Sequence, residues 1–322
     1  MKTAASVALL VVSMAWSSAS AAQDYPLRPI RVLAPFPAGS GVDVVARLIA
    51  TPLAQSVGQA VVVDNRPGAA GKIACELAAR AAPDGYTLLL GNASTLAMLP
   101  NLDKRVEFDP VKSFAPIALI SSSANVLVVH PAVAATSVSA LITLAKAKPG
   151  ALNYGSAGAG NSTHLAAELF KLSAGVDLVH VPYKGTPPMI TDLLSGRIQL
   201  SFTSLLSALP HVQQGRLRAL GVTSVKRAAS LPDVPTISEA GLKGYEMVVW
   251  QGILAPARTP QPIVARLNSE VVKILQTRET RERLAAQGLE PVGGTPAEFH
   301  AYIAAEVAKW AKVIKHAGIT PE

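Results

Sequence analysis

Short apolar runs alternate with longer stretches of helical spacing from residue 30 onwards. Ile30–Ala34, Ala60–Asp64 and Thr87–Leu90 are continuous and rich in β-branched residues and leucine, which predicts buried strands. Between them apolar residues recur at helical spacing, which predicts helices from about Val42 to Gln55 and after Gly71 through Ala81. Apolar strands joined by helices predict an α/β fold with a parallel sheet covered on both faces.

Residues 115 to 223 repeat this alternation and predict a second αβ unit. Ala115 to His130 predicts two strands, at 117–120 and 126–129, separated by a break at Ser121–Ser123. A chain of 322 residues exceeds the usual size of a single core, so two domains are expected. The other elements predicted in this unit are helices at about 138–146 and from the turn at 183–188 to residue 194, and strands at 178–181, 198–202 and 219–223.

Two helices at the carboxyl end carry the clearest signals. One has an apolar face from Ile263 to Leu275. The other begins with Thr295 as N-cap, Pro296 at the first position and Glu298 completing a capping box. Such regular helices indicate scaffold rather than chemistry. Trp250, which follows an apolar run, is expected in the core near the junction of the domains.

The amino end has the pattern of a secretory signal peptide. Lys2 precedes an apolar run from Ala4 to Trp16, and small residues with an A-x-A site at Ala19–Ala21 follow. We therefore expect residues 1–22 to be removed and the rest to be exported. The only cysteine, Cys75, falls on the apolar face of a predicted helix, so a buried thiol is expected.

Charge and composition narrow the partners. The chain has 29 Lys and Arg against 21 Asp and Glu, a formal charge of +8, and 5% aromatic residues. The basic residues are scattered rather than clustered, which argues against a nucleic-acid partner. A mild positive field would instead help to gather small anions.

The segment from Asn153 to His164 is the main candidate for a ligand site. It combines glycines with hydroxyl side chains just before a predicted helix, and such helix starts bind anions. Gly155 to Gly160 has the spacing of a phosphate-binding P-loop, but Asn161 replaces the essential lysine. A carboxylate or a single phosphate therefore fits better than a nucleoside triphosphate. The turns at 35–41 and 91–95 also follow strands, where such sheets bind ligands.

Catalytic, metal and cofactor motifs are incomplete. His164 and Glu168 have the spacing of two metal ligands on a helix, but no third ligand stands nearby in sequence, so a surface pair or a pocket-edge histidine is expected. The other histidines are dispersed along the chain. A Gly-x-Ser-x-Gly elbow is missing from the sequence, and Val44 replaces the third glycine of a dinucleotide fingerprint. We expect no metal, cofactor or catalytic residue.

Several segments together resemble the Bug family of periplasmic solute-binding proteins, the receptors of tripartite tricarboxylate transporters. The resemblance implies a type II periplasmic-binding-protein fold with two doubly wound α/β domains and a ligand cleft between them. It implies domain 1 at 23–124 and 232–322 and domain 2 at 125–231. The segments that carry it are Tyr25–Arg31, Pro35–Gly39 with Asp43, Asp64–Gly68, Ala82–Tyr86, Val181–Gly185 and Leu231–Thr236.

The resemblance also implies which residues meet the ligand. Asp43 would help to hold the first turn at its helix start. Contacts from domain 1 would come from Phe36, Pro37, Ala38, Gly39, Ser94 and Thr95, and contacts from domain 2 from Ser156, Ala157, Asn161, Ser162, Thr163, His164, Lys184, Gly185 and Thr186.

Three positions depart from the family pattern. Ser40 replaces a common glycine, Thr186 and Pro187 continue a turn that often has Gly or Ser, and Thr203 stands where the family often has Asp. Losing a carboxylate at 203 would weaken binding of an amine, so a ligand without positive charge is expected.

The implied function is that of a periplasmic receptor, acting as a monomer and without enzymatic activity. It would close over a small mono- or dicarboxylate, aromatic acids included, and present it to the membrane permease of a tripartite transporter or to a sensor kinase. An exported hydrolase or lyase using the same cleft is the alternative.

Overall fold

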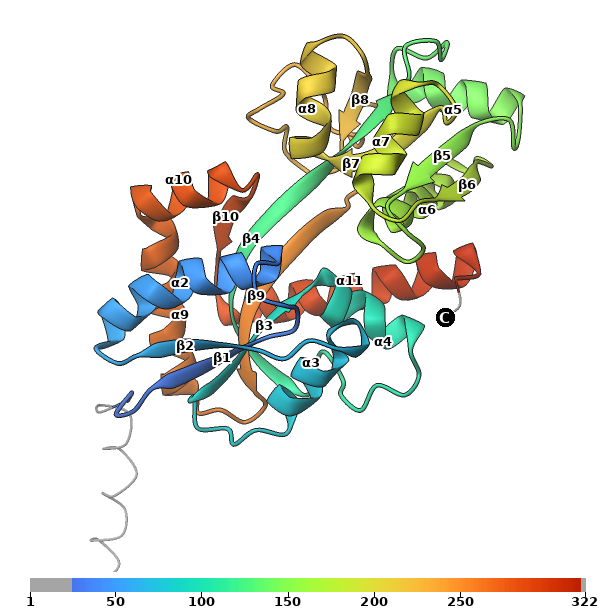
Figure 1. Cartoon of the computed structure of the whole chain (residues 1–322). Helices are drawn as coiled ribbons and strands as arrows, with labels where there is room; N and C mark the ends of the chain where they lie inside the picture. The colour runs from blue at the N-terminus through green and yellow to red at the C-terminus, as the bar shows by residue number, and fades with distance from the viewer. Residues whose placement is uncertain (1–24, 320–322) are drawn as a thin grey trace, which may run out of the picture.

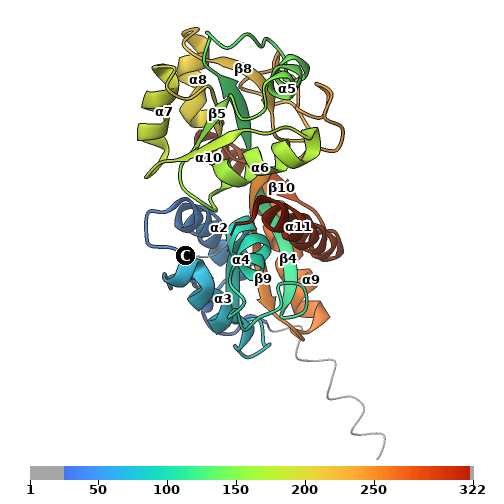
Figure 2. The same cartoon turned by 90° about the vertical axis from the view of Figure 1, so that its right-hand side faces the viewer.

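The computed structural model describes residues 25–319 as two lobes joined by a pair of long strands (Figure 1). The predicted signal peptide lies outside the described residues. Lobe 1 contains both ends of the described chain, and lobe 2 is built from residues between them. The strands β4 (Phe114–Val129) and β9 (Val248–Pro256) run from one lobe to the other, which Figure 2 shows from the side. Among residues 25–319, the helices include none that is long and apolar enough to cross a membrane.

Lobe 1 is built on the sheet order β2-β1-β3-β9-β4. The strands β1 (Ile30–Ala34), β2 (Val61–Asn65) and β3 (Thr87–Asn92) are parallel, as predicted, whereas β9 is antiparallel to β3 and β4. One apolar core lies between this sheet and the helices α2 (Gly41–Val57) and α9 (Gln261–Gln276). On the other face lie α3 (Lys72–Ala79), the π-helical turn η2 (Ala93–Met98) and α11 (Pro296–Ala317).

Lobe 2 continues the sheet with the order β4-β7-β5-β6, and β8 (Arg218–Val222) also pairs with β4. The strands β5 (Asn153–Ser156), β6 (Val179–Pro182) and β7 (Leu200–Ser204) are parallel in their mutual pairs. The helix α6 (Ser162–Ala174) packs in the core shared with lobe 1, and α7 (Thr186–Leu194) and α8 (Leu205–Gln213) cover a separate core. The remaining elements are η1 (Ala69–Gly71), α4 (Leu99–Leu102), α5 (Val138–Ala147), α10 (Arg278–Ala286) and β10 (Glu290–Gly293).

The predicted break at Ser121–Ser123 is wrong. All three serines lie inside β4, where they pair with Gln251, Trp250 and Val249 of β9. Pairing across the two connecting strands satisfies the backbone there, so the polar side chains do not end the strand. The sequence analysis also missed β9 itself, α8, α10 and β10.

The carboxyl-terminal scaffold is confirmed. Thr295 and Glu298 form the predicted capping box of α11. Trp250 is fully buried on β9, and its indole N–H donates to Glu306 of α11 at 2.9 Å. Glu306 also accepts from the Trp310 indole at 3.1 Å and pairs with Lys309. Cys75 is fully buried, as predicted, and burial raises the pKa of its thiol to about 12.

Candidate functional site

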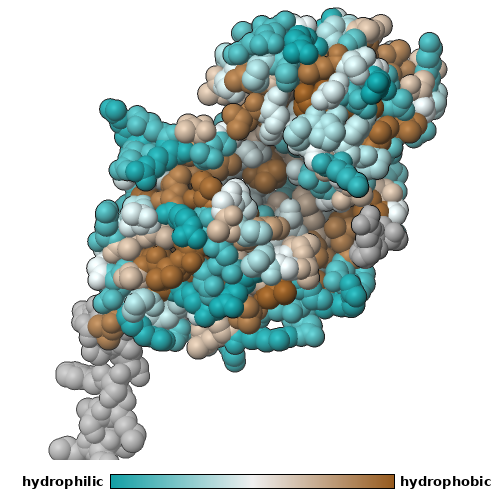
Figure 3. Space-filling model, viewed as in Figure 1, coloured by the Kyte–Doolittle hydropathy of each residue, from teal (hydrophilic) through white to brown (hydrophobic). Residues whose placement is uncertain are grey.

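The molecular surface is hollowed between the two lobes (Figure 3). Turns at the carboxyl ends of β1 and β3 belong to lobe 1, and turns after β5 and β6 belong to lobe 2. The turn after β5 reaches the other lobe, since a Cβ atom built on Gly160 would lie 4.0 Å from Cδ1 of Leu102 in α4. The turns that the sequence analysis singled out therefore come from facing lobes.

In lobe 1, Asp43 fixes the turn of Phe36, Pro37, Ala38 and Gly39, in which Phe36 is half-buried and the other three residues are exposed. Its carboxylate is buried and accepts hydrogen bonds from the Gly39 N–H and from Asn65 Nδ2, both at 2.9 Å. It also accepts from Arg47 Nε at 3.0 Å. Although burial opposes the charge, these hydrogen bonds hold the pKa of Asp43 below its ordinary value. Asp43 therefore holds the turn, in agreement with its implied role.

Asn65 is a site residue that the sequence analysis missed. It ends β2, and its Nδ2 donates both to the Phe36 carbonyl and to Asp43, each at 2.9 Å. An amide at the carboxyl end of a strand next to β1 was the available signal, because adjacent parallel strands bring their ends together.

The second turn of lobe 1 follows β3. Asn92 caps η2 by accepting from the Thr95 N–H at 2.9 Å, and the Asn92 N–H donates to the Thr95 hydroxyl at 3.2 Å. Thr95 is fully buried, whereas Ser94 is exposed at the rim. Gly71 lies where the turns meet, with φ +93°, and a Cβ there would come within 2.5 Å of Thr95 Cγ2 and 3.1 Å of Pro35 Cβ. Only glycine fits this backbone and this space.

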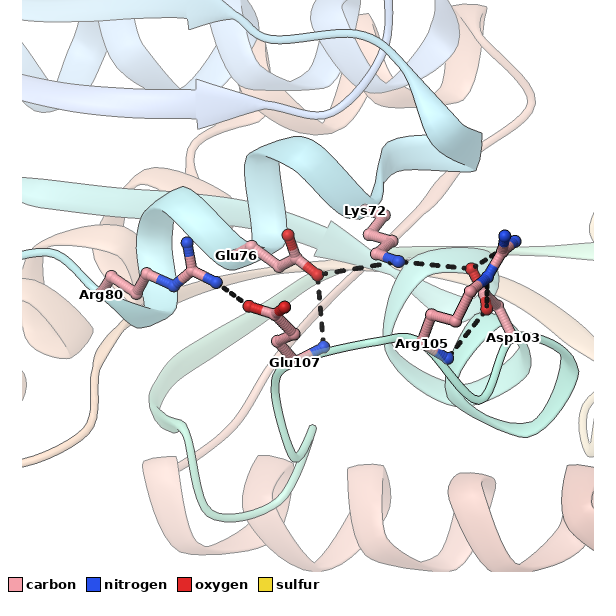
Figure 4. A network of polar contacts seen from close by, with 6 residues as sticks. All are labelled: Lys72, Glu76, Arg80, Asp103, Arg105 and Glu107. Atoms are coloured by element: carbon pink, nitrogen blue, oxygen red, sulfur yellow. Dashed lines mark hydrogen bonds and ion pairs between the residues drawn. The ribbon is translucent and has the colours of Figure 1, made fainter.

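A network of charges fixes the start of α3 beside this turn (Figure 4). Lys72 Nζ lies 3.4 Å from Asp103 Oδ2 and 4.0 Å from Glu76 Oε1. Arg105 donates to Asp103, and these hydrogen bonds lower the pKa of Asp103 to about 2. Glu107 links the same loop to α3, through its N–H to Glu76 and its carboxylate to Arg80. Lys72 is thus engaged by carboxylates of the protein.

In lobe 2, α6 begins at Ser162, before the end of the segment that was expected to precede the helix, because Asn161 caps it. Asn161 Oδ1 accepts from the Thr163 N–H at 2.9 Å and from the Ser162 hydroxyl at 3.2 Å. The Thr163 hydroxyl in turn accepts from the Ala157 N–H at 2.8 Å. The turn from Ala157 to Asn161, called the lobe 2 loop below, is therefore preformed around a helix start, an arrangement that favours anions.

The turn after β6 packs against the lobe 2 loop. The Gly185 N–H donates to the Ala157 carbonyl at 3.2 Å, and Gly185 has φ +108° at the start of α7. Lys184 is exposed, and Thr186 is half-buried in the first turn of α7. Thr203 is fully buried on β7, and its hydroxyl finds no hydrogen-bond partner among residues 25–319.

The structure brings together two histidines that lie far apart in the sequence. The rings of His164 on α6 and His180 on β6 stack with centroids 3.9 Å apart and planes at 7°. The prediction that His164 and Glu168 form a surface pair is wrong, because both side chains are buried. His164 Nε2 lies 3.9 Å from Glu168 Oε1. Within residues 25–319, the three-dimensional arrangement contains no group of three potential ligands that could hold a metal ion.

Ser156 and His180 lie at the distance of a nucleophile and its base. Ser156 Oγ is 2.6 Å from His180 Nε2. However, Ser156 is fully buried, and its hydroxyl also contacts the Gly158 carbonyl at 3.2 Å and the Gly158 N–H at 3.3 Å. A serine enclosed in this way is held for structure, and a substrate could not reach it in this conformation. The pair therefore does not favour the hydrolase alternative.

Comparison with known proteins agrees with this architecture. Residues 45–319 match the family described as "Tripartite tricarboxylate transporter family receptor". Protein BugT of Bordetella pertussis is 36% identical over 313 residues, which cover 97% of this chain and 96% of BugT.

Three solved structures extend the comparison. Rpa4515 of R. palustris with adipate is 39% identical, with a TM-score of 0.72, over 92% of this chain and 100% of that one. MatC (Rpa3494) from Rhodopseudomonas palustris with bound malate is 31% identical, with a TM-score of 0.68, over 90% and 100%. A TctC solute-binding protein from Polaromonas without ligand is 28% identical, with a TM-score of 0.84, over 90% and 99%.

Proposed function

Because the chain belongs to the tripartite tricarboxylate transporter receptor family, we propose that it captures a small carboxylic acid between its lobes and delivers it to a tripartite transporter permease. The observation that carries this proposal is the pair of preformed turns, one held by Asp43 and one capped by Asn161. One turn lies at the start of α2 and the other at the start of α6, and a helix start on each side suits one carboxylate at each end of a ligand. Adipate and malate, found in two similar proteins, are dicarboxylates.

Ligand capture is proposed to close the lobes about β4 and β9. The described arrangement has more in common with the ligand-free Polaromonas protein, at 28% identity and TM-score 0.84, than with the adipate complex, at 39% identity and TM-score 0.72. An open arrangement of the lobes would give this order of similarity. We expect small-angle scattering to report a smaller radius of gyration when a stabilising acid is added. Identical profiles would contradict closure.

The ligand is proposed to lack a positive charge. The reason is that Thr203, near the carboxyl end of β7, stands where the family resemblance places a carboxylate that would hold an ammonium group. The variant Thr203→Asp should therefore bind aspartate more tightly than the wild type does, and malate more weakly. Tight binding of amino acids by the wild type would refute this part of the proposal.

The central experiment is a thermal-shift screen of carboxylic acids on the mature chain. A ligand at 100 times its Kd stabilises the folded state by about 2.7 kcal/mol, which raises Tm by about 4 °C in a protein of this size. Adipate, malate and aromatic acids form the core of the panel. The binding acid should be recovered unchanged after prolonged incubation, because turnover would favour the hydrolase or lyase alternative. A panel without any shift would contradict the proposed function.

Three further measurements address location, assembly and the membrane partner. Export through the predicted leader at residues 1–22 should place the mature protein in the periplasm, which fractionation of the expressing bacterium can test. Light scattering should give the mass of a monomer. Growth on the binding acid should require both this chain and the permease genes. A requirement for a sensor kinase instead would support the signalling variant.

A further inference from the structure

Three aromatic rings lie nearly parallel behind the lobe 2 loop. Besides the stacked pair, Tyr154 of β5 lies with its ring centroid 4.9 Å from His180 and 6.2 Å from His164. Tyr154 is fully buried, His164 is 6% exposed and His180 is half-buried. The three rings therefore form one layer between β5, β6 and α6.

Each histidine of this layer holds one part of the chain around the loop. His180 Nε2 lies 2.6 Å from the hydroxyl of Ser156, the last residue of β5 before the loop. His164 Nδ1 accepts the Gly160 N–H at 3.0 Å, just before the cap of α6. The two bonds fix the loop at its start and near its end, and neither nitrogen is available to a ligand while its bond persists.

The bond to Gly160 determines the charge of His164. A ring nitrogen accepts an N–H only when it carries no proton, so His164 must be neutral with its proton on Nε2. Protonation of Nδ1 would remove the bond and set two N–H groups against each other. It would also place an imidazolium against the face of His180, 3.9 Å away.

The charged groups beside the two rings, Glu168 and Lys171, both come from α6, and β5 contributes the neutral Tyr154. Glu168 accepts from the Tyr154 hydroxyl at 2.5 Å and from Lys171 Nζ at 2.8 Å, so its charge is largely committed to these partners. Burial and Lys171 lower the pKa of His164 although Glu168 opposes them. Burial, His164 and Lys171 likewise lower the pKa of His180 to about 4. Both rings are therefore neutral at neutral pH, in agreement with the hydrogen bond that His164 accepts.

From this geometry we infer that His164 and His180 are positioning residues for the ligand-binding form of the lobe 2 loop, and that His164 holds this form only while its ring is neutral. Ligand affinity then falls on acidification, and binding at acidic pH releases protons. The inference rests on the proposed function, because it gives the loop a carboxylate to bind.

Paired variants separate positioning from general structural damage. In His164→Asn the side-chain oxygen can replace Nδ1 as acceptor for the Gly160 N–H, but it does not titrate; in His164→Leu the acceptor is lost. With the acid that gives the largest thermal shift as probe, His164→Leu should bind about fivefold to tenfold more weakly than His164→Asn at every pH, the value of one hydrogen bond. A His164→Asn variant that binds as weakly as His164→Leu at pH 7.5 would contradict the positioning role. His180→Gln and His180→Leu form the corresponding pair for the bond to Ser156.

The pH profile supplies the decisive readout. The ratio of the wild-type Kd to the His164→Asn Kd cancels ionisation of the probe, and it should rise about fivefold between pH 7.5 and pH 5.0. Calorimetry in buffers of different ionisation enthalpy should show proton release by the wild type at pH 5.0, and less by the variant. A flat ratio would refute the inference. A ratio that falls on acidification would show that an imidazolium attracts the ligand directly, which also refutes it.

A measurement without ligand keeps this inference separate from the proposed function. The Gly160 amide of the wild type should be protected from hydrogen exchange at pH 7 and lose protection relative to His164→Asn at pH 5, after correction for intrinsic exchange. Equal protection in both proteins across this range would refute the positioning role even if no acid in the panel binds. If protection changes as expected and no acid binds, only the proposed function fails.

Discussion

Replacing Asp43 by alanine tests the lobe 1 turn most directly. The substitution removes a buried carboxylate that accepts from Gly39, Asn65 and Arg47 at 2.9–3.0 Å. Hydrogen bonds to a charged group contribute about 1.5–3 kcal/mol each, but they are not additive, and Arg47 is 53% exposed, so its share is small. We expect the free energy of unfolding to fall by about 2–4 kcal/mol, which denaturant titration would measure.

The same variant should lose ligand affinity for a separate reason. Without the bond to Gly39, the exposed residues of the turn must be ordered on binding, which costs about 1–2 kcal/mol for each residue fixed. Ordering two residues corresponds to roughly a thirtyfold or greater loss of affinity, measured by calorimetry at a temperature where the variant is folded. Asp43→Asn should lie between the wild type and Asp43→Ala. The exposed Asp233→Ala serves as control. A destabilised Asp43→Ala that binds within twofold of the wild type would refute the reasoning.

Three further substitutions probe the scaffold, the packing and the charge. Glu306→Leu leaves two buried indole N–H groups without their acceptor and should lower the free energy of unfolding by about 3–5 kcal/mol in denaturant titration. Glu306→Gln retains an acceptor and should lower it by only about 1–2 kcal/mol. Equal losses in the two variants would contradict this role of Glu306. Gly71→Ala should lower the free energy of unfolding by about 2 kcal/mol more than Gly39→Ala does. Both glycines have positive φ, but only a Cβ atom on residue 71 would have neighbouring atoms within 4 Å. Similar losses in denaturant titration would show that backbone strain alone matters. Because the folded-state pKa of His180 is about 4, below its unfolded value of about 6.5, its contribution to stability is complete above pH 6.5 and is lost as pH falls towards 4. The wild type should therefore lose about 2 kcal/mol more than His180→Gln between pH 7.5 and 4, and parallel stability profiles would contradict this.

Sequence patterns over a few neighbouring residues correctly predicted those elements that are stabilised by contacts between such neighbours. The capping box at Thr295 and Glu298 and the apolar faces of α9 and α11 needed only helix periodicity, and all are present. The predicted strands β1, β2 and β3 are parallel as expected, because continuous apolar runs with helices between them permit few other arrangements. The turns that follow the strands and face the hollow between the lobes could be predicted as well, because glycines and hydroxyl residues after an apolar run are visible in the sequence.

What the sequence by itself determined is therefore the regular helices at the carboxyl end, the parallel pairing of β1, β2 and β3, and the positions of the turns that follow the strands. Tertiary structure alone decided three things. It kept β4 continuous through Ser121–Ser123, since the partner strand β9 supplies the hydrogen bonds. It made Asn65 part of the lobe 1 turn, since neighbouring strands end together. It stacked His164 on His180, residues that sequence periodicity could not relate, because contacts between α6 and β6 depend on how the chain returns through space.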